Sequence, residues 1–105
     1  MSRKDEIKKM ASFVGNSAAH VGVYGEEAVE KEITVYVEVA LEMARGRTWN
    51  GREIEDFKNS AVRKVSGVIK ERIRRGDLGE KEFDLALRGA RTYIDKFADE
   101  ELSRK

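Results

Sequence analysis

Apolar residues recur at helical spacing along almost the whole chain, and this periodicity limits its fold more than any other feature. Drawn at about 100° per residue, three stretches place their apolar side chains on a single face. These stretches lie near residues 2–20, 51–75 and 80–103, and a fourth, near 26–45, has the same period but a broader apolar face. The pattern predicts an all-α fold, an antiparallel four-helix bundle-like domain that covers residues 1–105.

Capping signals mark the ends of the expected helices. Asn50 stands where an N-cap belongs, and Glu53 follows three residues later, so the two side chains can form a capping box. Trp49 precedes the cap and is placed to pack on the first turn as a hydrophobic staple. Gly46 and Gly76 occupy positions typical of residues that end helices. The resulting loops are short, which predicts that consecutive helices are antiparallel neighbours.

Residues 20–25 are the stretch for which the pattern allows two conformations. The sequence Val21-Gly22-Val23-Tyr24 is compatible with a frayed helix end and also with a β-like turn. The first helix is therefore expected to end near residue 20.

Composition limits the class of protein further. Charged residues make up 39% of the chain, yet the net charge is only +1 and the apolar residues are periodic, which indicates a folded chain. Cysteine and glutamine are absent and asparagine is scarce, a composition that resembles thermophilic proteins. The N-terminal residues lead into no apolar signal-peptide segment, and no apolar run approaches about 18 residues. We expect a cytoplasmic protein.

The stretch 26–45 carries more apolar surface than a peripheral helix needs. Its polar residues form one narrow stripe, and the apolar arc spans roughly 240°, against the ~100–150° of an ordinary surface helix. Either this helix is the central helix of the bundle, or one apolar flank packs inside and the other meets a second copy of the chain. The inner flank would be Ile33, Val37, Ala40 and Ala44; the candidate homodimer interface is Val35, Tyr36, Val39 and Met43. We favour the dimer, since two-fold dimers are the commonest oligomers.

A second candidate surface lies on the stretch 51–75. Between residues 63 and 75 six basic residues stand against a single acid. Arg63, Lys70 and Arg74 fall on the outer helical face, where a phosphate backbone could lie along them. The alternative is a solvated charged face whose last cations complement the helix dipole.

Two acidic pairs suggest a third interpretation. Glu27-x-x-Glu30 and Glu53-x-x-Asp56 resemble the paired acidic motifs of the all-α nucleotide pyrophosphohydrolases of the MazG type. That resemblance implies Mg²⁺ bound by acids and metal-dependent nucleotide hydrolysis. Both pairs, however, stand at helix N-termini that lie about 30 Å apart in antiparallel neighbours.

The sequence predicts no catalytic, cofactor or metal residues. His20 lacks companion ligands at metal-binding spacing, and no serine, threonine or lysine has an identifiable base beside it. The primary expectation is a helical interaction module without enzymatic activity that self-associates through the stretch 26–45. Nucleic-acid binding through Arg63, Lys70 and Arg74 is the alternative, and nucleotide hydrolysis is a third. Another protein partner is compatible with the first expectation, and a membrane is not expected.

Overall fold

A computed structural model describes residues 3–27, 30 and 34–103 of this chain, and in that part every regular element is helical. In chain order the elements are α1 (Arg3–Tyr24), α3 (Thr34–Ala44), α4 (Gly51–Arg74), the short η1 (Glu80–Glu82), α5 (Phe83–Phe97) and η2 (Ala98–Leu102). The predicted all-α, bundle-like fold is confirmed.

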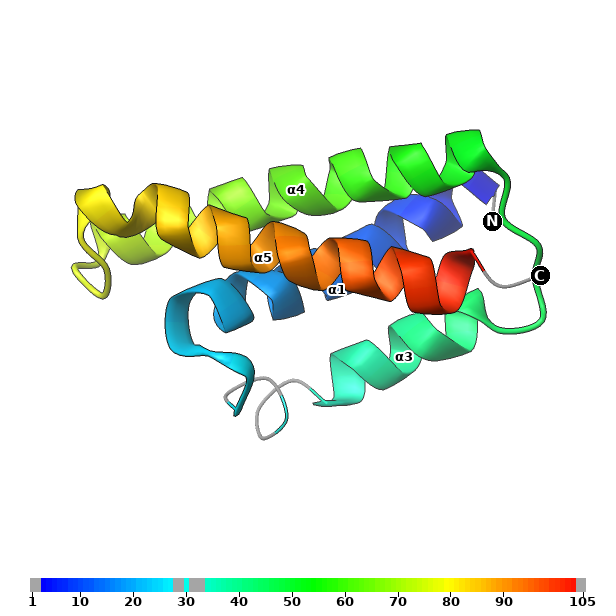
Figure 1. Ribbon diagram of the computed structural model, residues 1–105, viewed down its shortest axis with the longest axis horizontal. Helices are drawn as coiled ribbons and strands as arrows, with labels where there is room; N and C mark the ends of the chain where they lie inside the picture. The colour runs from blue at the N-terminus through cyan, green and yellow to red at the C-terminus, as the bar shows by residue number, and fades with distance from the viewer. Residues whose placement is uncertain (1–2, 28–29, 31–33, 104–105) are drawn as a thin grey trace.

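The helix α1 is the centre of the molecule. It packs against α3, α4 and α5, whereas α3 packs against α1 and touches η2 (Figure 1). The prediction that the second and third helices pack against each other as neighbours is therefore wrong, because α1 lies between α3 and α4. The alternative that the stretch 26–45 is the central helix is also wrong, since α3 lies at the edge of the bundle.

Small residues explain why α1 can hold this position. A Cβ atom added at Gly15 would stand 2.7 Å from the backbone oxygen of Ala61 in α4. One added at Gly22 would stand 2.2 Å from the backbone oxygen of Ala86 in α5. These glycines allow α4 and α5 to approach the backbone of α1 from two sides.

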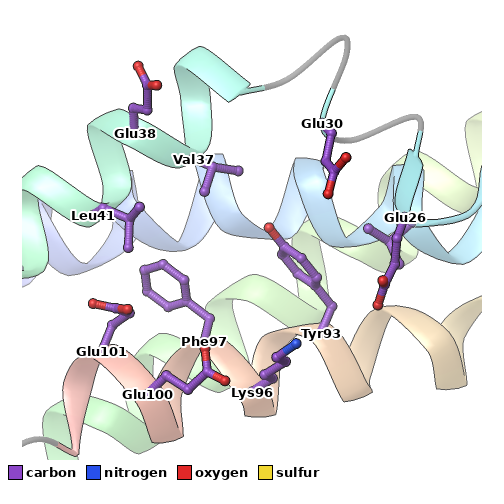
Figure 2. Close-up of a pocket in the computed structure, with 11 residues that line it drawn as sticks. Glu26, Glu30, Val37, Glu38, Leu41, Tyr93, Lys96, Phe97, Glu100 and Glu101 are labelled. Atoms are coloured by element: carbon purple, nitrogen blue, oxygen red, sulfur yellow. The ribbon is translucent and has the colours of Figure 1, made fainter.

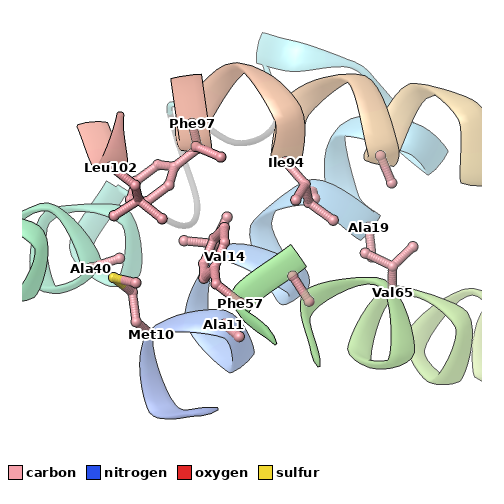
Figure 3. Close-up of a cluster of buried hydrophobic side chains, with 14 of the residues drawn as sticks. Met10, Ala11, Val14, Ala19, Ala40, Phe57, Val65, Ile94, Phe97 and Leu102 are labelled. Atoms are coloured by element: carbon pink, nitrogen blue, oxygen red, sulfur yellow. The ribbon is translucent and has the colours of Figure 1, made fainter. Parts of the chain in front are cut away.

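The core is built around the buried side of this helix. Met10, Ala11 and Val14 of α1 are fully buried, and side chains from the other helices converge on them (Figure 3). Phe57 of α4 and Phe97 of α5 lie with ring centroids 5.6 Å apart, a favourable distance for an aromatic pair.

The helix ends follow the sequence signals in part. Asn50 and Glu53 form the predicted capping box, and Trp49 is buried with its Nε1–H donating to the carbonyl oxygen of Ala44. Gly46 and Gly76 both have positive φ, as expected of residues that end helices. The predicted end near residue 20 and the β-like turn are wrong, because α1 continues to Tyr24 and ends at a positive-φ glycine, Gly25.

Within the predicted helix 26–45, Glu26, Glu27 and Glu30 are helical and α3 covers Thr34–Ala44, whereas residues 28–29 and 31–33 lie outside the described part of the chain. The predicted helix 80–103 divides into a 3₁₀ turn, an α-helix and a wider π-type final turn, η1, α5 and η2. The predicted 51–75 matches α4 to within one residue.

A pair of glycine substitutions tests the close approach to α1. We expect Gly22→Ala to lower the free energy of unfolding by about 1–3 kcal/mol, because the new methyl group meets a backbone oxygen that cannot rotate away. Gly67→Ala is the control, since Gly67 lies inside α4 with open space where its Cβ would stand. It should raise the same free energy by about 0.5–1 kcal/mol. Chemical denaturation measures both free energies of unfolding. Equal changes in the two variants would contradict the close approach of α5 to α1 at Gly22.

Candidate interaction surfaces

The outer face of α3 carries the candidate dimer residues. Tyr36 is 45% exposed and Val39 is 39% exposed, while Met43 is partly buried against the core. The side chain of Val35 lies outside the described residues. On the opposite flank, Ala40 and Ala44 are buried, as predicted, so α3 shows one face to α1 and another to solvent.

Phe13 extends this exposed face onto α1. Its ring stacks on Tyr36 with centroids 5.7 Å apart, and it is partly buried. We call Phe13, Tyr36, Val39 and Met43 the α3 patch. The contribution of Phe13 could not be read from one helix, because it depends on which face of α1 meets α3.

Ion pairs link the loop between α3 and α4 to the start of α1. Arg3 donates to the Glu53 carboxylate at 2.6 Å and to the carbonyl oxygen of Thr48 at 2.8 Å. The Arg3 guanidinium also lies over the Trp49 ring, 4.7 Å from its centroid. Arg47, in the loop between α3 and α4, forms an ion pair with Glu6 of α1. These contacts fix where α4 begins relative to α1.

The three predicted phosphate-binding residues are all exposed on α4 but face different surroundings. Arg63 lines the grooves between α1 and α4. Lys70 lies instead in a depression toward η1 and α5 that also contains Glu80 and Asp84. Arg74 donates to Glu71 at 2.6 Å, and the hydrogen bond lowers the pKa of that carboxyl. The structure therefore does not gather the three into one groove.

A different set of cations follows the line where α1 meets α4. Two adjoining grooves, of about 570 and 410 Å³, lie along this line and share Arg63. We call their basic lining residues the basic seam: Arg3, Lys4, Lys8, Arg52, Arg63, Lys64, Arg72 and Arg75. Sequence reasoning missed Lys4 and Lys8, although their i,i+4 spacing already placed them on one side of the first helix.

Acidic residues gather on another side of the molecule. A cavity of about 510 Å³ lies between α3 and α5, with Val37, Leu41 and Phe97 forming apolar walls (Figure 2). Among its described lining residues are five glutamates and one lysine: Glu26, Glu30, Glu38, Glu100, Glu101 and Lys96. Tyr93 points into it, and burial, followed by the charge of Glu26, raises the pKa of the phenol.

The acidic pairs of the MazG-type resemblance are not brought together. Glu53 and Asp56 line the first groove of the basic seam, whereas Glu30 lines the acidic cavity beside α3. Across residues 3–27, 30 and 34–103, no three histidine, cysteine, aspartate or glutamate side chains are grouped so as to hold a metal ion. His20 contacts Asn16 and Arg72, with its Nδ1 2.9 Å from the Asn16 carbonyl oxygen.

Comparisons with protein families, with curated proteins and with solved structures found no match to this chain. In the described part of the chain, no helix is long and apolar enough to cross a membrane.

The link between Arg3 and Glu53 predicts an acid-sensitive contribution to stability. Hydrogen bonds from Arg3 and from the Asn50 backbone lower the pKa of the Glu53 carboxyl below its ordinary 4.5. Because the folded-state pKa is the lower one, the contribution is present above pH 4.5 and is lost as the pH falls through the folded value. Glu53→Gln should therefore destabilise the protein at neutral pH and progressively less on acidification.

Denaturation of both proteins between pH 7 and pH 3 measures this difference. Glu55→Gln is the matched control, since it removes the same charge from an exposed site on the same helix. If the difference in free energy of unfolding between wild type and Glu53→Gln widens as the pH falls, the stabilising role given to the ionised Glu53 carboxylate is contradicted.

Proposed function

We propose that this chain is a small helical interaction module that self-associates through the α3 patch. The observation that carries the proposal is the one-sided packing of α3, which leaves Tyr36 and Val39 exposed beside the partly buried Phe13 and Met43. Apolar side chains that share one exposed surface favour association, because each large one buried contributes roughly 1.5–3 kcal/mol.

A second copy of the chain is the partner that fits this patch. A two-fold axis brings the same surface of each protomer together, so an apolar patch meets an apolar patch. Glu42 and Arg45 are exposed at the C-terminal end of α3 and form an ion pair at 3.3 Å within one chain. These charged residues would lie at the rim of the contact, outside its apolar centre.

Because α3 is short, the proposed dimer interface is small and its affinity is expected to be weak. The eleven residues of α3 span about 16 Å at 1.5 Å per residue. Stable interfaces bury at least about 1,200 Å² in total. Phe13 enlarges the patch beyond α3, and we expect dissociation in the micromolar range.

The test is the mass of the protein in solution. Wild type should sediment as a dimer at about 100 μM and dissociate on dilution, as its micromolar affinity requires. Val39→Glu should be monomeric over the same range with an unchanged helical circular-dichroism spectrum, because its charge would be buried at the contact.

Leu85→Glu is the matched control. Leu85 is 67% exposed on α5, more so than Val39, and lies outside the α3 patch. The same change there should leave the dimer intact. A monomeric wild type, or equal loss of dimer in both variants, would contradict the proposal.

A further inference from the structure

The net charge of the chain is small, but basic and acidic residues are separated on its surface. Eight basic side chains and three carboxylates line the two grooves of the basic seam in the described structure. Three of the basic residues pair with carboxylates, Arg3 with Glu53, Arg75 with Glu71 and Arg72 with Asp77, and the lining is still net positive. The acidic cavity beside α3 carries the opposite sign. A positively charged surface attracts polyanions even when the net charge of the whole protein is close to zero.

The seam has the shape of a track rather than a point site. Its cations on α4 run from Arg52 to Arg75, about 35 Å along the helix at 1.5 Å per residue. Arg63 lines both grooves, so the positive lining continues from one to the other. Gly67 contributes no side chain to the second groove. Asn16, Asn59 and Ser60 add hydrogen-bonding groups along the same line.

An exposed aromatic side chain stands at the far end of this track. Tyr24 is 49% exposed, and its ring lies 5.9 Å from the guanidinium carbon of Arg72, which lines the second groove. The His20 ring centroid lies 5.9 Å from that of Tyr24. A positively charged groove that ends at an exposed ring is the combination by which proteins bind single-stranded nucleic acid, with phosphates along the groove and a base stacked on the ring.

We propose that the basic seam binds a single strand of nucleic acid, with a base stacked on Tyr24. The seam uses α1 and α4, whereas the α3 patch uses α3 and Phe13, so this inference does not depend on self-association. Of the three residues predicted from the sequence to contact phosphate, it keeps Arg63 and replaces Lys70 and Arg74 with Lys8 and Lys64, which line the grooves beside Arg63.

Fluorescence anisotropy with a labelled oligo(dT) of about 12 nucleotides tests the proposal at salt concentrations from about 50 to 200 mM. The seam variant carries Lys8→Ala, Arg63→Ala and Lys64→Ala, all at exposed positions. If each side chain contacts one phosphate, the slope of log K against log salt should fall by about 2, at ~0.7 per contact. The control variant carries Lys81→Ala, Arg88→Ala and Arg91→Ala, which remove the same charge from exposed sites on η1 and α5. Its slope should match that of wild type.

Tyr24→Ala separates stacking from charge. We expect it to weaken binding of the oligonucleotide about tenfold, to leave the salt slope unchanged, and to leave retention on heparin unchanged, because heparin has no bases.

The proposal would be overturned by no binding of wild type at about 50 mM salt, by tighter binding of a duplex of the same length than of the single strand, or by equal loss of binding in the seam and control variants. Retention on heparin without binding of the oligonucleotide would overturn it as well.

Discussion

Close backbone contact along α1 is the constraint on which the rest of the structure depends. Gly15 lets α4 approach on one side and Gly22 lets α5 approach on another, at distances that leave no room for a Cβ atom. With α4 and α5 held there, α3 covers a further side of α1 without packing along α4. The one-sided placement of α3 and the grooves between α1 and α4 both follow from this arrangement.

The same arrangement sorts the charges. Parallel packing of α1 and α4 brings Lys4 and Lys8 beside Arg52 and Arg63, so basic residues far apart in the sequence line one surface. The α3 and α5 side collects glutamates around an apolar cavity instead. A nearly neutral chain therefore carries a basic surface and an acidic one on different sides of the molecule.

Much of the fold could be predicted from the sequence, because helical periodicity and the capping box of Asn50 and Glu53 are local signals. The central role of α1 could not, since small residues such as Gly15 contribute little to an apolar pattern and act through the neighbours they admit. The broad apolar arc of the stretch 26–45 allows a central helix as the alternative to a dimer, and that alternative is wrong because α3 lies at the edge of the bundle. Likewise, a helical wheel of one stretch showed Arg63 but could not show the α1 lysines that pack beside it.

Native-state amide hydrogen exchange tests the central position of α1 most directly. In dilute protein, where self-association is absent, amides of residues 10–19 should exchange slowest, through global unfolding, because this segment is enclosed by three helices. Amides of α3 should exchange faster, through local opening of a helix held mainly on one side. If α3 amides in dilute protein exchange as slowly as those of residues 10–19, the account of α1 as the single organising helix is contradicted.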